Sequence, residues 1–260
     1  LSHILHTFRY DNPCSMRASK VNSMQEDRLP PPEWCYHEPD HPGMDFDAIA
    51  PSYDRNMQRF RDIQGEVEEI LSFLEIKPHH SLLEIGTGTG EFALAAARRC
   101  ARVYAIDISP GMLQYAREKS QGQGISNISF LVGGFLTYHH HDGPLDAIVS
   151  QIAMHHLPDF WKQIALLNIA SMLRPGGRLC LRDIVYSFDP GDYERQIERF
   201  ISKTMEKAGP GFAQSMTSHI NKEFSTMDWI MRGLIERAGF VIEREEQKEG
   251  FLGLYLCKKI

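Results

Sequence analysis

The segment Glu84-Ile85-Gly86-Thr87-Gly88-Thr89-Gly90 decides the fold that this sequence predicts. Its glycines follow a short apolar run, residues 81–85, which is typical of a buried parallel strand. Glycine lets the backbone pass close to a ligand and adopt dihedral angles that other residues avoid. Open α/β sheets bind ligands at the carboxyl ends of their strands, where the strand order reverses. The segment therefore predicts a ligand-binding turn.

An acidic residue, Asp107, ends the next predicted strand and can accept hydrogen bonds from both hydroxyls of a ribose. Dinucleotide-binding proteins share this arrangement, but their pattern is G-x-G-x-x-G. Here the third glycine, Gly90, comes one residue early, and Glu91 takes the later position. A carboxylate beside that helix start would repel a pyrophosphate. The pattern thus favours a nucleoside-containing ligand that carries no phosphate.

Strand and helix patterns alternate outward from this turn. Five short apolar runs predict strands at residues 81–85, 103–108, 128–132, 145–150 and 178–185, with helices between them. Such alternation predicts parallel βαβ units with right-handed crossovers. Residues 240–243 and 251–257 predict a closing hairpin. We therefore expect an α/β fold with a Rossmann-like, doubly wound, seven-stranded sheet, mostly parallel, with an antiparallel strand in the C-terminal hairpin.

Proline content and helix-capping signals predict the domain organisation. Residues 1–45 are rich in proline and show no period, which predicts an irregular extension before a single domain at residues 46–260. Ser109-Pro110 predicts the start of one helix, and Ser225 with Asp228 predicts a capping box for the last one. An amphipathic helix is expected between Tyr193 and Met205.

Composition narrows the class of protein. The 260 residues carry a formal net charge of −6, which does not favour a general nucleic-acid binder. No apolar run approaches the roughly 18 to 20 residues that span a bilayer. The five cysteines form no C-x-x-C pair, so we expect reduced thiols in a cytoplasmic protein.

Four ordered motifs resemble class I S-adenosylmethionine-dependent methyltransferases: EIGTGTG at 84–90, AIDISPGM at 105–112, LDAIVSQIAMHHLP at 145–158 and LRPGGRLCL at 173–181. The segment FDAIAPSYD, residues 46–54, is similar to one that precedes the domain in the small-molecule, quinone-biosynthesis-like (methyltransferase type 11/12) subgroup. The resemblance implies methyl transfer from S-adenosylmethionine, with S-adenosylhomocysteine as product and no metal. It also implies that residues 188–226 form a lid over the substrate.

The resemblance implies a role for each matching residue. The glycine turn would meet the methionine part of the cofactor, Asp107 the ribose, and Gln151 the sulfonium. The full set of expected cofactor-binding residues is Tyr53, Glu84, Gly86, Thr87, Gly88, Gly90, Asp107, Ile108, Met112, Gly134, Phe135 and Gln151.

One position departs from the family pattern. After the third strand the family usually places an acid that binds the adenine amino group, and this chain has Gly134 there. The amide of Phe135 can still meet a ring nitrogen. A lost hydrogen bond costs about 0.5 to 1.5 kcal/mol, so weaker cofactor affinity is expected.

Methyl transfer from a sulfonium needs alignment more than it needs a nucleophile. If a general base takes part, His155 and His156 are the candidates, since they follow the fourth strand and imidazole titrates near neutrality. At least one of them is expected to be structural. We expect a small-molecule acceptor and no nucleic-acid partner; the oligomeric state is not predicted.

Two alternatives stay open. The first is a methyltransferase that modifies RNA or protein. Amino-methyltransferases of nucleic acids usually carry an (N/D)-P-P-(Y/F) loop after the fourth strand, where this chain has Gln151-Ile152-Ala153-Met154. The second is a non-catalytic S-adenosylmethionine-binding module, which only Gly134 supports.

Overall fold

The computed structural model describes residues 33–38, 46–57 and 62–260. Its strands are β1 (Ser81–Ile85), β2 (Arg102–Asp107), β3 (Ile128–Val132), β4 (Leu145–Gln151), β5 (Leu173–Tyr186), β6 (Thr226–Met227), β7 (Phe240–Lys248) and β8 (Leu252–Lys259). Its α-helices are α2 (Phe46–Met57), α3 (Ile63–Leu74), α4 (Glu91–Ala97), α5 (Pro110–Gly122), α6 (Asp159–Met172), α7 (Tyr193–Ala208), α8 (Pro210–Lys222) and α9 (Asp228–Arg237).

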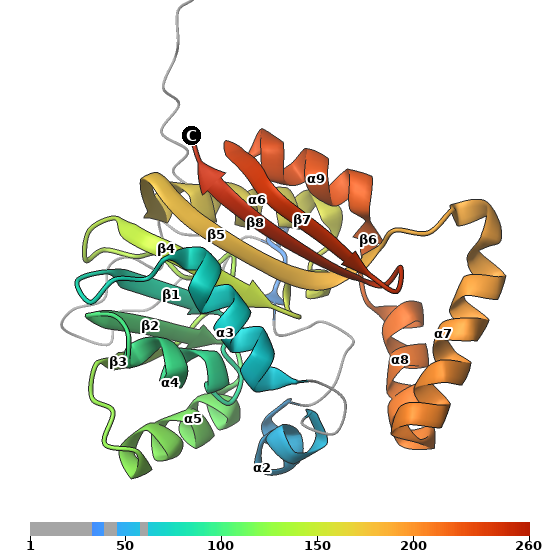
Figure 1. Cartoon of the computed structure of the whole chain (residues 1–260), viewed down its shortest axis with the longest axis horizontal. Helices are drawn as coiled ribbons and strands as arrows, with labels where there is room; N and C mark the ends of the chain where they lie inside the picture. Colours follow the sequence, from blue (N-terminus) through green and yellow to red (C-terminus); the bar gives the residue numbers. More distant parts are fainter. Residues whose placement is uncertain (1–32, 39–45, 58–61) are drawn as a thin grey trace, which may run out of the picture.

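The sheet has the order β3-β2-β1-β4-β5-β8-β7, with β6 paired to the end of β5 (Figure 1). Strands β1 to β5 run parallel to one another, and β8 lies between β5 and β7 and is antiparallel to both. The predicted α/β fold class is therefore confirmed. The strand order reverses between β1 and β4, so the glycine turn after β1 lies at the switch point of the sheet.

Successive side chains of each strand point to opposite faces of the sheet, and helices cover both faces. Leu82 and Val103 pack with α3 and α4 on one face, while Leu83 and Ile85 pack with α6 and α9 on the other. Full burial of such a side chain contributes roughly 1.5 to 3 kcal/mol. The short apolar runs form strands because both of their faces are covered, and this rigid sheet holds the turns at its carboxyl edge.

The helix starts test two cap predictions. Ser109 caps α5 as predicted, with its hydroxyl accepting a hydrogen bond from the amide of Met112. The capping box at Ser225 is wrong: α9 begins at Asp228, and its N-cap is Met227, which makes no side-chain cap. Ser225 instead contacts the ring of His219, because tertiary packing places α8 beside it.

The segment between β5 and α9 folds into two helices that project from the body of the domain (Figure 1). Helix α7 matches the predicted amphipathic helix, whereas α8 follows after Gly209 and was not predicted. Strand β6 was also missed, because two residues carry no readable period. The end of α8 returns to the carboxyl edge of the sheet.

Two N-terminal segments also reach that edge. Tyr36 packs against the main core, and its hydroxyl donates to the backbone oxygen of His156 at 3.0 Å. Helix α2 is tied to the start of α5, because Asp47 accepts from the Ser109 hydroxyl at 2.5 Å and from the Gly111 amide at 2.8 Å. The remainder of the expected extension, residues 1–32 and 39–45, lies outside the described residues.

Three cysteines, Cys100, Cys180 and Cys257, are buried free thiols. Cys35 is disulfide-bonded, so the expectation of reduced cysteines is wrong at that position. Within the described ranges no helix combines the length and the apolar character that crossing a membrane requires.

Candidate active site

A cavity of about 690 Å³, including its mouth, opens at the switch point between β1 and β4. The cavity is lined by the glycine turn, the ends of β2 and β4, the turn after β3, and two N-terminal segments. Its residues are Glu38, Phe46, Tyr53, Ile85, Gly86, Gly88, Asp107, Ile108, Met112, Gly133, Gly134, Phe135, Gln151, Ile152, Ala153, His156 and Leu157.

The glycine turn forms one wall of the cavity. Gly86 has φ of +74°, and a Cβ there would lie 2.7 Å from the Cβ of Ala153. Gly88 has φ of +52°, and a Cβ there would meet no atom within 4 Å. Gly90 differs: it is the N-cap of α4, a Cβ there would lie 3.0 Å from the Cβ of Ala116, and it does not line the cavity. Two of the three glycines thus face ligand space, and the third serves helix packing.

Asp107 holds the turn in place. Its Oδ2 accepts from the Gly88 amide at 2.7 Å, and its Oδ1 accepts from the Ser109 amide at 2.9 Å. Burial raises the pKa of Asp107, although these two amides act in the opposite direction. A carboxylate has about four acceptor sites, so each oxygen can accept one more hydrogen bond. Because Asp107 lines the cavity, two neighbouring hydroxyls of a ligand can bind there.

Glu84 lies beneath the turn and does not line the main cavity. Its carboxyl group accepts from the Thr87 hydroxyl at 2.6 Å, and burial raises its pKa to about 8. Glu84 and Thr87 line an adjoining hollow together with Tyr53 and Gln151. Both residues therefore shape the turn from below.

The turn after β3 contains a residue that sequence reasoning missed. The carboxylate of Glu38 accepts from the amide of Phe135 at 2.7 Å and of Leu136 at 3.1 Å. A Cβ on Gly134 would lie 2.4 to 2.6 Å from the three atoms of that carboxyl group. Glu38 is 5% exposed and lines the cavity. An acidic group thus occupies the place left by the missing side chain at Gly134, and it comes from the N-terminal segment.

Comparison with known proteins agrees with this geometry. Residues 82–177 match the family described as a methyltransferase domain. An uncharacterized methyltransferase of Geobacillus kaustophilus is 30% identical over 199 residues, which cover 75% of this chain and 86% of that protein. The chain belongs to the class I S-adenosylmethionine-dependent methyltransferases. A second relative, an uncharacterized methyltransferase of Bacillus mycoides, is 28% identical over 199 residues, covering 75% of this chain and 87% of that protein.

Solved structures share the fold at lower identity. A SAM-dependent methyltransferase from Aquifex aeolicus is 18% identical with a TM-score of 0.57, covering 84% of this chain and 100% of that one. Magnesium protoporphyrin IX methyltransferase from Synechocystis PCC 6803, solved with bound SAM, has a TM-score of 0.54 and covers 85% of this chain and 100% of that one. These likenesses show that the chain shares the fold of these proteins.

Helix α2 closes the methyltransferase crevice from the side. It carries Tyr53 into the cavity wall, and Asp54 binds both Thr89 and the ammonium of Lys119. Ile152, which also lines the cavity, has φ of +52°, which is a strained conformation for a β-branched residue. Strain of this kind gathers at functional sites, where the surrounding packing maintains it. The strained turn directs the backbone after Gln151 along the cavity.

The two candidate bases occupy different environments. His155 is buried, with Nδ1 2.5 Å from Oδ1 of Asp183 and Nε2 3.1 Å from Oε2 of Glu223. Burial alone lowers the pKa of His155, but these two carboxylates outweigh it and raise the pKa to about 9. His155 does not line the cavity, whereas His156 does. Only His156 is placed to meet a bound molecule directly.

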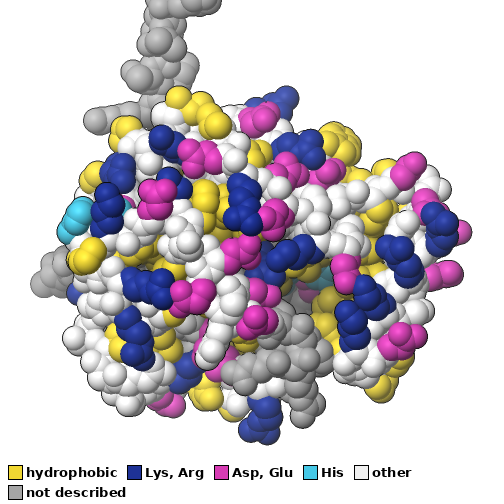
Figure 2. Space-filling model, in the orientation of Figure 1, with side chains coloured by type: hydrophobic (Ala, Val, Ile, Leu, Met, Phe, Trp, Pro, Cys, Tyr) yellow, Lys and Arg dark blue, Asp and Glu magenta, His cyan; other side chains and the backbone are white. Residues whose placement is uncertain are grey.

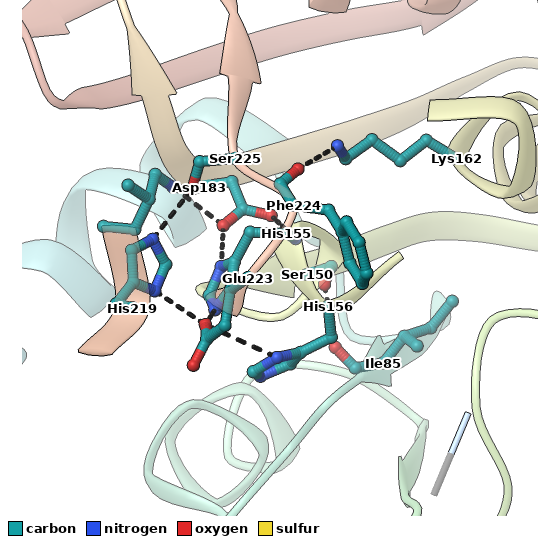
Figure 3. Close-up of polar contacts among 11 residues, drawn as sticks. Ile85, Ser150, His155, His156, Lys162, Asp183, His219, Glu223, Phe224 and Ser225 are labelled. Atoms are coloured by element: carbon teal, nitrogen blue, oxygen red, sulfur yellow. Dashed lines mark hydrogen bonds and ion pairs between the residues drawn. The ribbon is translucent and has the colours of Figure 1, made fainter. Parts of the chain in front are cut away.

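Glu223 connects the two histidines to the α7–α8 insertion (Figure 3). Its Oε2 lies 3.6 Å from Nδ1 of His156 and 2.6 Å from Nδ1 of His219. Burial favours the neutral carboxyl group, yet the imidazoles of His155 and His219 hold the pKa of Glu223 well below its usual range. Sequence reasoning did not find Glu223 or His219, because both lie in a segment without a motif.

The end of α8 is held beside the cavity by a buried lysine. The ammonium of Lys162 donates to the backbone oxygen of Phe224 and, at 2.7 Å, to Asp159. The amide of Phe224 in turn donates to the backbone oxygen of His155 at 2.9 Å. Because Lys162 is fully buried, this connection is not weakened by solvent. The insertion therefore delivers Glu223 to a defined place.

Proposed function

We propose that this methyltransferase transfers a methyl group from S-adenosylmethionine to a small-molecule acceptor bound at the His156 end of the cavity. The observation that carries the proposal is the cavity itself, which is lined both by the carboxylate of Asp107 and by the imidazole of His156. The residues fit the methyl donor: Gly88 leaves open space, Asp107 retains acceptor capacity, and Ile108 and Met112 offer an apolar wall.

Glu38 completes the proposed cofactor site. An adenine ring that lies against Met112 and Phe135 would present its amino group to the turn after β3. There the Glu38 carboxylate is held by two backbone amides and can accept one more hydrogen bond. Glu38 would thereby do what a side chain at position 134 does elsewhere in the family. The affinity loss expected from Gly134 is then offset within this chain.

The protein contributes placement and proton transfer to the reaction. The sulfonium of the bound donor supplies both the methyl group and the leaving group. Gln151 and the backbone of the strained turn would align the acceptor, so that acceptor atom, methyl carbon and sulfur lie in line. A proton leaving the acceptor would pass to His156, whose Nδ1 faces Glu223. Asp183 and His155 would keep Glu223 charged and in position.

Two features favour a small acceptor over RNA or protein. The cavity is partly covered by α2 and by the segment that carries Glu38, which leaves little room for a folded macromolecule. Side chains of both charges are interspersed on the face shown in Figure 2, without the continuous basic surface that RNA binding uses.

Labelled methyl transfer tests the proposal. The full chain is incubated with S-adenosylmethionine carrying an isotopic methyl group and with separated fractions of a cell extract: small molecules, RNA and protein. We expect label in the small-molecule fraction, and we expect the His156→Ala variant to lose it while still binding S-adenosylhomocysteine in calorimetry. Label confined to RNA or protein would overturn the assignment of the acceptor. Failure to bind either form of the cofactor would indicate a non-catalytic module.

A further inference from the structure

The histidine cluster beside the cavity has the composition of a metal centre. Ligand atoms of His155, His156 and Glu223 all lie within 4.8 Å of one another, and Figure 3 shows both rings next to the Glu223 carboxylate. Two imidazoles and one carboxylate are a ligand set that zinc enzymes use when they keep a fourth position open for water or substrate. Imidazole also suits other first-row divalent ions.

The distances within the cluster resemble the edges of a coordination sphere. Oε2 of Glu223 is 3.1 Å from Nε2 of His155 and 3.6 Å from Nδ1 of His156. Two ligands bound tetrahedrally at about 2.0 to 2.1 Å would lie roughly 3.3 Å apart. Oε2 is buried, and it is within 3.6 Å of a ring nitrogen of His155 and of His156. The ligand atoms of these three residues are therefore close enough to share one bound ion.

The outer contacts are those of metal-binding histidines. Such a histidine commonly donates its second ring nitrogen to a carboxylate, which fixes the tautomer and makes the first nitrogen a ligand. Nδ1 of His155 lies 2.5 Å from Oδ1 of Asp183, a fully buried carboxylate that also accepts from the His155 amide. Nδ1 of His219, 2.6 Å from Oε2, orients Glu223, while its own Nε2 contacts Ser225 at 2.8 Å.

The charges of the cluster also favour a bound cation. Two carboxylates, Asp183 and Glu223, meet in a nearly dry cluster, with side chains 0% and 13% exposed. Buried charges are costly unless they are paired with charges of opposite sign. One divalent cation among neutral imidazoles would neutralise both. Protonated imidazoles are the competing source of positive charge, and they make a different prediction about metal uptake.

We propose that His155, His156 and Glu223 bind one divalent transition-metal ion, with Zn²⁺ as the reference ion, at the acceptor end of the cavity. This proposal departs from the sequence-based expectation of no metal. Local sequence patterns did not reveal the site, because Glu223 follows His155 by about 70 residues and comes from the α7–α8 insertion. Metal binding by these residues does not depend on the proposed function, but a role of the bound ion in catalysis does. There the ion would bind an acceptor hydroxyl and lower its pKa. With His156 bound to the ion, the hydroxyl proton would leave to water and not to His156, while the O–C bond forms and the S–C bond of the donor breaks.

The test is zinc uptake by the full chain, purified without a polyhistidine tag and stripped with a chelator. After dialysis against ZnCl2, bound metal is measured by mass spectrometry, and Co²⁺ uptake is followed by its electronic absorption. We expect one equivalent in the wild type and at least about tenfold weaker binding in Glu223→Gln and in His156→Gln. His141→Gln is the matched control, because residues 139–141 form a separate run of three histidines, and its uptake should match the wild type.

Calorimetry with S-adenosylhomocysteine checks that each variant retains a folded cofactor site. If Glu223→Gln does not fold, His156→Gln decides, since its ring is partly exposed and easier to replace. Uptake far below one equivalent in the wild type, or equal uptake in the His156 and Glu223 variants, would overturn the proposal and assign the cluster to protonated imidazoles. Zinc uptake without methyl transfer would retract the proposed function and leave the metal site standing.

Discussion

Exchanging the acid between positions 38 and 134 tests the cofactor site most directly. The Glu38→Ala variant removes the carboxylate that accepts from the amides of Phe135 and Leu136. A hydrogen bond to a charged group contributes about 1.5 to 3 kcal/mol. At 1.4 kcal/mol for each factor of ten, affinity for S-adenosylmethionine should fall roughly 10- to 140-fold.

The second half of the exchange restores the acid on the turn itself. In the wild type, a side chain at position 134 would collide with Glu38, because its Cβ would lie 2.4 Å from Oε1. In the Glu38→Ala background that space is empty, so Gly134→Asp can place a carboxylate there. The double variant should recover affinity to within about threefold of the wild type, since one charge-assisted hydrogen bond is lost and one regained.

Titration calorimetry with S-adenosylmethionine measures all three proteins, and Glu33→Ala, an exposed acid in the same segment, is the matched control. Unchanged affinity in Glu38→Ala would refute the reasoning. Tighter binding would refute it as well, because Glu38 would then be a competitor of the adenine for the Phe135 amide. A double variant no better than Glu38→Ala would show that the loss came from the segment and not from its acid.

Three further outcomes are expected. Asp107→Asn should weaken S-adenosylmethionine binding by roughly tenfold or more in calorimetry, because the amide loses charge towards the ligand hydroxyls; equal affinity would misplace the ribose. Between pH 4.5, the ordinary pKa of a glutamate, and about pH 8, Glu84 keeps its proton in the folded state but loses it in the unfolded state. The free energy of unfolding of the wild type should therefore fall as pH rises through that window, by at most about 1.4 kcal/mol per pH unit. Urea unfolding of Glu84→Gln should show a weaker dependence on pH, and parallel profiles for the two proteins would contradict this. Lys162→Met should lower the free energy of unfolding by about 1 to 3 kcal/mol in the same assay, because the Phe224 oxygen loses its donor, and an unchanged midpoint would show that this contact is dispensable.

The cofactor half of the site could be anticipated from local sequence. The turn at Gly86–Gly90 and the acid at Asp107 belong to consecutive βα units, and parallel strands bring their carboxyl ends to one edge of the sheet. Chain direction and strand pairing alone therefore place them together. Gly90 was expected to meet the cofactor but does not line the cavity; a glycine that packs a helix against its neighbour looks the same in sequence as one that faces a ligand.

The other parts of the site, on both the cofactor side and the acceptor side, depended on contacts between residues far apart in the sequence. Glu38 meets Phe135 across 97 positions, and no periodicity or motif encodes that distance. Likewise, Ser225 has the spacing of a helix cap, yet the return of α8 makes it a partner of His219. Patterns in a sequence report local propensity and burial, whereas these pairings follow from how the insertion and the N-terminal segment pack on a finished sheet.

By itself, the sequence determined the strand and helix pattern, the order of the motifs and the position of the glycine turn and Asp107 at the ends of β1 and β2, because each depends on residues within one βα unit or two consecutive ones. Only the tertiary structure decided that Glu38 fills the space at Gly134 and that Glu223 lies beside His155 and His156. Both come from segments whose position depends on long-range packing, and such packing leaves no repeating signal in the chain.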